Sequence, residues 1–332
     1  MNNSGGVGII GIGSCLPDKI LTNFDLEKMV DTSDEWIIKR TGISERRILE
    51  KEKPAYELGV KASLDALKDA GISAEDLDMV IVATATPDYM TPSTACIIQG
   101  KIGAIKAAAF DLNAACSGFV YSLSIAEKII KSGTHKYILV VGCEGLSKVT
   151  DYEDRNTCIL FGDGAGAVVL GPVEEGYGIL STHIGADGKG SDLITIPNTY
   201  ISEVDLSKRL NLKKYSLWME GSEVFKFAVR IIAQASNKAL EDANLSLDDI
   251  KLIVPHQANI RIIDGAAKRL GVPIEKLYTN IQKYGNISSA SIPVALHEVV
   301  ENKLITKGDN ILIVGFGGGL TWASAVIKWN KY

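Results

Sequence analysis

Short apolar runs alternate along the chain with longer segments in which apolar and polar residues recur at helical spacing. Short runs rich in β-branched residues are typical of strands, whereas apolar positions three and four apart indicate helices. This alternation predicts an α/β fold. The expected strands are Val7 to Ile12, Met79 to Ala83, Ala108 to Leu112, Tyr137 to Gly142, Ala167 to Leu170, Leu252 to Pro255 and Asn310 to Gly315. The expected helices are Pro54 to Gly71, Gly118 to Ser132, Ser222 to Ala243 and Arg261 to Leu270.

One helix–turn–strand pattern occurs twice. ALKDAGISAEDLDMVIV (66–82) aligns with ALEDANLSLDDIKLIVP (239–255) at an offset of 173 residues, with six of 17 positions identical. ILVVGCEG (138–145) aligns with ILIVGFGG (311–318) at the same offset, with five of eight identical. The shared offset predicts one compact unit of two similar α/β halves, residues 1–174 and 175–332, related by a pseudo-twofold axis. Active sites commonly lie where such parts meet.

Composition narrows the class of protein. The 332 residues are 46% hydrophobic and 23% charged, which is typical of globular proteins. A net charge of −5 gives no indication of nucleic acid or an anionic membrane as a partner. No apolar stretch reaches the length of about 18 residues that a spanning helix needs, and the N-terminus lacks the basic region of a secretory signal. A charged segment, 202–214, is expected to be a solvated insertion.

The five cysteines are widely spaced and contain no C-x-x-C pair. This pattern favours neither a disulfide framework nor a zinc site and fits a reducing cytoplasm. Cys116 stands out, because in DLNAACSGFVYSL (111–123) it separates a strand-like run from a helix-like one. Amides at a helix start favour the thiolate, which is the nucleophilic form. Most free cysteines are instead small buried apolar residues, and both interpretations stay open at this point.

Three glycine-rich segments resemble ligand loops. GIGSCL (11–16) and GDGAGA (162–167) lack the helix start that must follow a phosphate-binding loop. Close backbone packing is therefore the favoured interpretation of both, with GDGAGA expected to join two strands. GFGGGLTW (315–322) ends a strand, and a tight turn and an oxyanion-binding loop are both open for it.

His256 differs in context from the other histidines. In LIVPHQANIRII it follows a buried apolar run and directly precedes a helix-like segment, and catalytic groups often collect at strand ends in α/β proteins. Asn286 lies 30 residues later in a Gly/Ser-rich turn, at an offset of 173 from Asn113, which is close to Cys116. This arrangement favours a Cys, a His and an Asn that converge from two halves. A buried, capped His and an ordinary turn Asn are the alternatives.

Together these motifs resemble the β-ketoacyl-acyl carrier protein synthase III family of the thiolase-like superfamily. The resemblance covers essentially the whole chain, and it implies the duplicated five-layer α/β/α/β/α sandwich with pseudo-twofold symmetry. It rests on SDEWIIKRTGISERR (33–47), AACSGF (114–119), RNTCILFGDGAGAVVL (155–170), EGSEVFK (220–226), HQAN (256–259), YGNISSAS (284–291) and GFGGGLTW (315–322).

The resemblance implies a role for each matching residue. Cys116 corresponds to the acylated nucleophile and His256 and Asn286 to its catalytic partners. The backbone amides of Cys116 and Gly318 correspond to the oxyanion hole. The implied coenzyme A-binding residues are Trp36 and Arg155 around the adenine, Arg40 at a phosphate, and Asn259 and Phe316 beside the catalytic centre. Arginine stacked on an aromatic ring or paired with phosphate is a strong mode of recognition.

Four basic residues also match the family, whereas Thr91 differs from the residue that many relatives have. Lys226, Arg261, Lys268 and Arg269 resemble the surface that docks acyl carrier protein, and a basic face could steer an acidic partner. A solvated charge run is the alternative for these four residues. At Thr91 many relatives have a large aromatic that reaches the acyl pocket of the partner subunit. The smaller threonine predicts room for a longer or branched acyl primer.

The implied reaction is a decarboxylative Claisen condensation of an acyl-CoA with malonyl-acyl carrier protein, through an acyl-Cys116 intermediate, that initiates fatty acid synthesis. The resemblance also implies a cytoplasmic homodimer with no metal or redox cofactor. A ketosynthase III-like condensing or acyl-transfer enzyme of a polyketide or secondary-metabolite pathway is one alternative. A non-catalytic acyl-CoA-binding relative is an alternative from another class. Asn286 stands where Cys-His-His synthases have a second histidine, which disfavours those enzymes.

Overall fold

The computed structural model describes residues 5–197 and 215–331, and the charged segment 202–214 lies outside them. Its strands are β1 (Gly6–Cys15), β2 (Ile20–Thr22), β3 (Glu45–Arg47), β4 (Met79–Ala83), β5 (Ala108–Leu112), β6 (Ile138–Gly145), β7 (Asp163–Val173), β8 (Gly178–Ala186), β9 (Ile194–Thr195), β10 (Trp218–Met219), β11 (Ile250–Pro255), β12 (Asn310–Gly317) and β13 (Thr321–Lys328). Its α-helices are α1 (Asn23–Leu26), α2 (Asp34–Thr41), α3 (Tyr56–Ala70), α4 (Thr94–Ile102), α5 (Gly118–Lys131), α7 (Gly221–Asp242), α8 (Ile260–Leu270), α9 (Ile281–Tyr284) and α10 (Ser291–Glu301).

Two sheets repeat the same order of strands. The first is β1-β7-β6-β4-β5, with parallel pairing of β4 to β6 and β5 and antiparallel pairing of β7 to β1 and β6. The second is β8-β13-β12-β11, again with two antiparallel pairs but with only one parallel pair. The expected boundary after residue 174 falls in the connection between β7 and β8.

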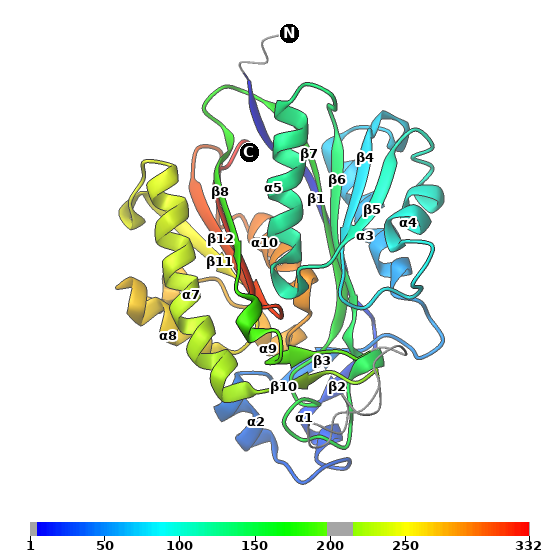
Figure 1. The fold of residues 1–332 in the computed structure, drawn as a ribbon, viewed down its shortest axis with the longest axis vertical. Coiled ribbons are helices and arrows are strands. Elements are labelled where there is room, and N and C mark those ends of the chain that lie inside the picture. Colours follow the sequence, from blue (N-terminus) through cyan, green and yellow to red (C-terminus); the bar gives the residue numbers. More distant parts are fainter. Residues whose placement is uncertain (1–4, 198–214, 332) are drawn as a thin grey trace.

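The helices and sheets form five layers (Figure 1). Helices α3 and α4 cover the outer face of the first sheet, α5 and α10 lie between the sheets, and α7 and α8 cover the second sheet. Each interface has its own apolar core, and the central one contains fully buried Ile81 and Ile313 from the two sheets together with Phe119 of α5. The predicted thiolase-like sandwich is confirmed.

Glycines allow the layers to approach closely. A Cβ at Gly11 of β1 would lie 2.1 Å from the carbonyl oxygen of Ala66 in α3, and one at Gly166 of β7 would lie 2.7 Å from Cβ of Pro293 in α10. The close-packing interpretation of both motifs is therefore right. The expectation that GDGAGA joins two strands is wrong, because 163–167 lie inside β7. Within the described ranges no helix is long and apolar enough to cross a membrane.

Candidate active site

A cavity of about 1280 Å³ brings together side chains from both halves of the chain. Cys116 lies in a 3₁₀ turn, η2 (Ala115–Ser117), just before α5, and His256 directly follows β11. Asn286 lies between α9 and a second 3₁₀ turn, η7 (Ser288–Ala290). All three line the cavity. The predicted convergence of a Cys, a His and an Asn is thus present in the structure.

The turn that presents Cys116 is shaped by its neighbours. Asn113 Oδ1 accepts a hydrogen bond from Ala115 N at 3.1 Å, and Ala115 has a left-handed backbone with φ of 46°. Strand β12 packs against this turn so closely that a Cβ at Gly317 would lie 2.6 Å from Cys116 N. The glycine-rich motif therefore lets the second half reach the backbone of the nucleophile turn.

Burial controls the chemistry of the Cys116 thiol. It raises the pKa of Cys116 to about 12, whereas hydrogen bonding to Ser288 lowers the pKa and the charge of Glu144 raises it. Desolvation of the charged form thus opposes the stabilisation of the thiolate that is expected from amides at a helix start. With this raised pKa, the thiol form of Cys116 is favoured at neutral pH.

His256 is buried and neutral. Burial lowers the pKa of its imidazole to about 3, so the ring carries no charge near pH 7. Its backbone N donates to Val314 O at 2.8 Å, and its ring meets Phe316 edge-on with centroids 5.3 Å apart. Nδ1 has no hydrogen-bond partner within residues 5–197 and 215–331. A neutral imidazole has one donor and one acceptor nitrogen.

The backbone around Asn286 holds this residue in place. Asn286 N donates to Leu160 O at 2.8 Å, and Gly162 N donates to Asn286 O at 3.0 Å. The side-chain Oδ1 accepts from Ser288 N at 2.9 Å. Because Oδ1 is engaged within the turn, Nδ2 is the group of this side chain that suits an incoming carbonyl oxygen.

Glu144 lies fully buried at the end of β6 and ties the two halves together. It accepts hydrogen bonds from Thr86 Oγ1 at 2.6 Å and Ala85 N at 3.1 Å, and Ser289 Oγ lies 2.8 Å from its Oε1. Burial raises the pKa of Glu144. Ala85 lines the cavity beside Cys116, so this carboxylate shapes the cavity wall.

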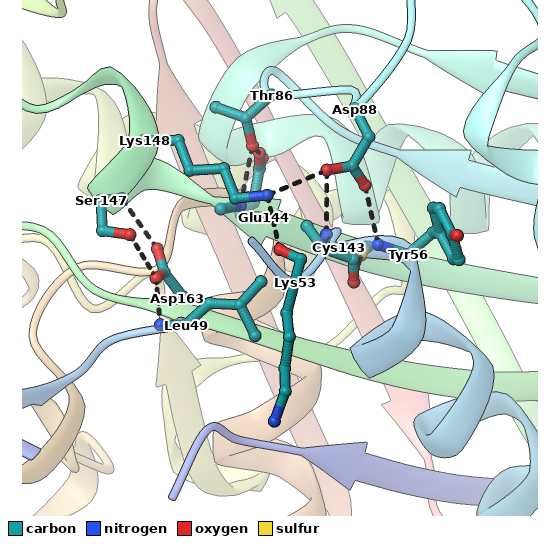
Figure 2. Close-up of polar contacts among 12 residues, drawn as sticks. Leu49, Lys53, Tyr56, Thr86, Asp88, Cys143, Glu144, Ser147, Lys148 and Asp163 are labelled. Atoms are coloured by element: carbon teal, nitrogen blue, oxygen red, sulfur yellow. Dashed lines mark hydrogen bonds and ion pairs between the residues drawn. The ribbon is translucent and has the colours of Figure 1, made fainter. Parts of the chain in front are cut away.

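Two further acids fix the loops next to Glu144 (Figure 2). Asp88 accepts from the backbone N of Tyr56, in the first turn of α3, at 2.9 Å and pairs with Lys148 at 3.2 Å. Asp163 accepts from Leu49 N and from Ser147. These bonds join loops from distant parts of the chain behind the cavity wall that Ala85 and Leu146 line.

Arginines stack on Trp36 at the mouth of the cavity. The guanidinium carbon of Arg155 lies 4.6 Å from the Trp36 ring centroid, and that of Arg40 lies 5.3 Å from it. Trp36 and Arg40 are one helical turn apart in α2, which Ser33 caps by accepting from Trp36 N. Since Arg155 contacts Trp36 directly, an adenine held between them must first part the two side chains.

The remaining predicted residues divide into two groups. Asn259, Phe316, Gly318, Lys226 and Arg261 line the cavity. Asn259 also begins α8, where its Oδ1 accepts from Arg261 N, and its Nδ2 donates to Arg40 O at 3.1 Å.

Four predicted residues do not line the cavity, and one of them is Arg155, which contacts Trp36 from outside the lining. Thr91 is exposed just before α4, and Lys268 and Arg269 are exposed in the last turn of α8. Sequence reasoning missed Ser288, which lines the cavity and lowers the pKa of Cys116. Its offset of 173 from Ala115, next to the nucleophile, was an available signal. Across the described residues, no group of three or more His, Cys, Asp or Glu side chains could hold a metal ion.

The sequence and the fold are matched in known proteins. Residues 110–188 match the family model 3-Oxoacyl-[acyl-carrier-protein (ACP)] synthase III, and residues 240–329 match its C-terminal counterpart. The chain is 53% identical over 325 residues to beta-ketoacyl-[acyl-carrier-protein] synthase III of Desulfitobacterium hafniense, covering 98% of each.

Two solved structures are similar along almost their whole length. The crystal structure of 3-oxoacyl-[acyl-carrier-protein] synthase III from Aquifex aeolicus VF5 has a TM-score of 0.91 and 47% identity, covering 98% of this chain and 100% of that one. The priming beta-ketosynthase from the R1128 polyketide biosynthetic pathway has a TM-score of 0.92 and 37% identity, covering 100% and 98%.

The duplicated sandwich with a cysteine, a histidine and an asparagine in one cavity defines a thiolase-like condensing enzyme. Within that class, this chain belongs to the 3-oxoacyl-[acyl-carrier-protein] synthase III family, also called beta-ketoacyl-[acyl-carrier-protein] synthase III. It is an acyltransferase by that membership.

Proposed function

We propose that this chain condenses an acyl-CoA primer with malonyl-acyl carrier protein, releasing carbon dioxide and forming 3-oxoacyl-acyl carrier protein, as the first condensation of fatty acid synthesis. The observation that carries the proposal is the single cavity in which Cys116, His256 and Asn286 meet behind an entrance lined by Trp36 and Arg40. The proposed steps use no metal and no redox cofactor, and we expect them to take place in the cytoplasm.

The first half-reaction transfers the acyl group to Cys116. Its sulfur attacks the thioester carbonyl, and the amides of Cys116 and Gly318 are proposed to hold the developing oxyanion. The carbon–sulfur bond to coenzyme A breaks, and coenzyme A leaves as the thiol with the proton that Cys116 gives up. Because the pKa of Cys116 is raised, this proton must leave during the attack and pass to the departing sulfur of coenzyme A.

The second half-reaction forms the carbon–carbon bond. His256 and Asn286 donate hydrogen bonds to the thioester carbonyl of malonyl-acyl carrier protein and stabilise the enolate that forms as carbon dioxide leaves. The enolate carbon attacks acyl-Cys116, the bond between the acyl carbon and the sulfur breaks, and the sulfur departs as a thiolate that takes up a proton from solvent. The low pKa of His256 supports this role, because a neutral donor needs no change of charge before the step.

We assign the recognition of coenzyme A to residues at the mouth of the cavity and that of the carrier protein to a basic surface. Trp36 and Arg155 are proposed to hold the adenine of coenzyme A, with Arg40 at a phosphate. Asn259 and Phe316, which also line the cavity, are proposed to act beside the catalytic centre. For the carrier protein we propose docking on the basic surface formed by Lys226, Arg261, Lys268 and Arg269, all of which are exposed.

A homodimer is also proposed. Strand β5 is the open edge of the first sheet, and Phe110 on it is 37% exposed. Met90 is 70% exposed beside Thr91, the proposed acyl-pocket residue. Pairing of this edge with a second copy would cover apolar side chains. Light scattering that gives the mass of one chain at working concentration would contradict the dimer, and an acyl-CoA chain-length profile would test the room at Thr91.

Incubation with acetyl-CoA followed by intact-mass measurement tests the reaction directly. We expect one acetyl group on the wild type and none on Cys116→Ala. A wild type that gains no acyl group, or a Cys116→Ala protein that gains it normally, would exclude the proposal and favour a non-catalytic acyl-CoA-binding protein. The similarity to the priming beta-ketosynthase keeps a polyketide-type enzyme as the second candidate. Faster condensation with malonyl-CoA than with malonyl-acyl carrier protein would favour such an enzyme.

A further inference from the structure

The short helix α9 connects the two catalytic side chains of the second half. At its start, Asn280 N donates to Gln257 Oε1 at 3.1 Å, and Gln257 directly follows His256. At its end, Tyr284 lies two positions before Asn286. The placement of α9 therefore affects where both His256 and Asn286 lie.

Helix α9 lacks the support that its counterpart in the first half has. At the offset of 173, residues 281–285 correspond to β5 (108–112), which leads to Cys116 and pairs with β4 over five residue pairs. In the described part of the second half, β11 pairs with the chain before α9 only at the bridge Ile253–Leu277. A helix of four residues is also marginal in isolation, because nucleation is costly. Backbone support for α9 from outside its own segment includes the bond from Ser44 N to Gln282 O at 3.0 Å, and side-chain contacts must add to it at the two ends of the helix.

One carboxylate bonds both ends of this helix. Glu298 of α10 accepts from Tyr284 Oη at 2.6 Å through Oε1 and from Asn280 Nδ2 at 2.7 Å through Oε2. Tyr278 Oη donates to the same Oε2 at 3.0 Å. Burial raises the pKa of Tyr284 and of Tyr278, so both phenols remain donors over the working pH range. The mechanism above gives Glu298 no role.

We propose that Glu298 is a positioning residue for the condensation step, because it fixes both ends of α9 and thereby the relative placement of His256 and Asn286. The proposal rests on the roles proposed for these two side chains. Cys116 is placed by the packing of β12 on its own turn and does not depend on this carboxylate. Loss of the Glu298 bonds should therefore slow condensation and leave acyl transfer from coenzyme A intact.

Tyr284→Phe is the most conservative test, because it removes one oxygen at the end of α9 next to Asn286. Glu298→Gln is the second variant, since it keeps the volume but offers an amide where Asn280 needs an acceptor. Tyr278→Phe is the matched control. It removes a bond to the same carboxylate, but Tyr278 N still donates to Ile253 O at 2.8 Å and keeps that segment in place.

Two rates are measured for each protein: acetylation of Cys116 by acetyl-CoA, and decarboxylation and condensation of malonyl-acyl carrier protein on the acetylated enzyme. We expect Tyr284→Phe and Glu298→Gln to acetylate within about twofold of the wild type and to condense at least about tenfold more slowly. Tyr278→Phe should stay within about twofold in both steps.

Equal slowing of both half-reactions, no slowing of condensation, or failure of both variants to fold would overturn the positioning role. A wild type that does not become acetylated would instead contradict the proposed function.

Discussion

Ala115 and Ser288 share a left-handed backbone conformation, with φ of 46° and 47°, at positions 173 residues apart. Each amide donates to the side-chain oxygen of an asparagine two residues earlier, at 3.1 Å in the first half and 2.9 Å in the second. The offset that relates the two halves in sequence thus also relates the two turns that build the cavity. A left-handed non-glycine residue costs energy, and both turns bear that cost next to the proposed chemistry.

The paired asparagines offer a matched test of catalytic and structural roles. Asn113→Ala and Asn286→Ala each remove the oxygen that accepts from a turn amide, so each should lower the free energy of unfolding by about 1 kcal/mol. Asn286 lines the cavity and Asn113 is exposed outside it. We therefore expect Asn286→Ala alone to slow condensation, by about 10²- to 10³-fold. Urea unfolding and single-turnover condensation measure the two effects, and a similar loss of condensation in Asn113→Ala would contradict this assignment.

Gly317 is expected to tolerate no side chain. An added Cβ would lie 2.6 Å from Cys116 N, so Gly317→Ala must push β12 away from the nucleophile turn. Such overpacking costs about 1–3 kcal/mol, and acetylation of Cys116 should slow because its amide moves. Gly100→Ala is the control, since a Cβ there meets open space in α4. Thermal unfolding and acetylation rates that are equal for the two variants would show that the close approach is unimportant.

The raised pKa of Cys116 predicts an unusual pH dependence of alkylation. With a pKa of about 12, only a small fraction is thiolate at neutral pH, and this fraction rises about tenfold per pH unit. The rate of iodoacetamide modification should therefore still be increasing at pH 10. Peptide mass spectrometry separates Cys116 from exposed Cys96, which serves as an internal control for reagent access. A plateau reached by pH 8 would show that the helix amides outweigh burial.

Trp36 should contribute to affinity for coenzyme A thioesters and not to the chemical step. Loss of an aromatic ring that stacks on a base costs about 1–3 kcal/mol, so Trp36→Ala should raise the KM for acetyl-CoA between roughly five- and 150-fold with little change in kcat. An acetyl-pantetheine thioester, which has no adenine, is the control substrate. A variant that loses as much activity with this substrate would place Trp36 in another role.

The proposed docking surface predicts an effect on one substrate alone. Arg261→Glu and Lys268→Glu should raise the KM for malonyl-acyl carrier protein, more strongly at low salt, and leave acetylation by acetyl-CoA unchanged. Lys51→Glu makes the same change of charge at an exposed position away from α8. Steady-state kinetics at two ionic strengths would show whether the four basic residues are instead an ordinary solvated face, in which case all three variants behave alike.

Local sequence patterns correctly predicted the helices and strands whose residues favour that same structure in isolation. Strands β4 and β5 begin and end at the predicted residues, and α5 differs from its prediction by one residue. Strand β8 was not predicted, because GILSTHIGA mixes polar and small residues at a sheet edge. The glycines of β7 were assigned to a connection because glycine disfavours strands in isolation, whereas here they allow Pro293 and Leu16 to pack closely.

Sequence motifs identified the residues of the candidate site, but they did not identify the carboxylates that support those residues. Cys116, His256 and Asn286 stand in recognisable segments, and all three line one cavity. Glu144 and Glu298 had no such signal, because a carboxylate with a fixed role is recognised by its partners in space. Glu298 accepts hydrogen bonds from three residues that lie 14 to 20 positions before it in the sequence. The offset of 173 also did not predict that the second half has the helix α9 where the first half has the strand β5.

Ser289 is the counterpart of Cys116 at the offset of 173. Its hydroxyl lies 2.8 Å from Ala83 O and 2.8 Å from Glu144 Oε1, and the residue is 1% exposed. A hydroxyl engaged inside the protein in this way cannot reach a thioester in the cavity. Although the fold contains two equivalent turns, we therefore expect each chain to load one acyl group, and we expect the proposed dimer to saturate at two.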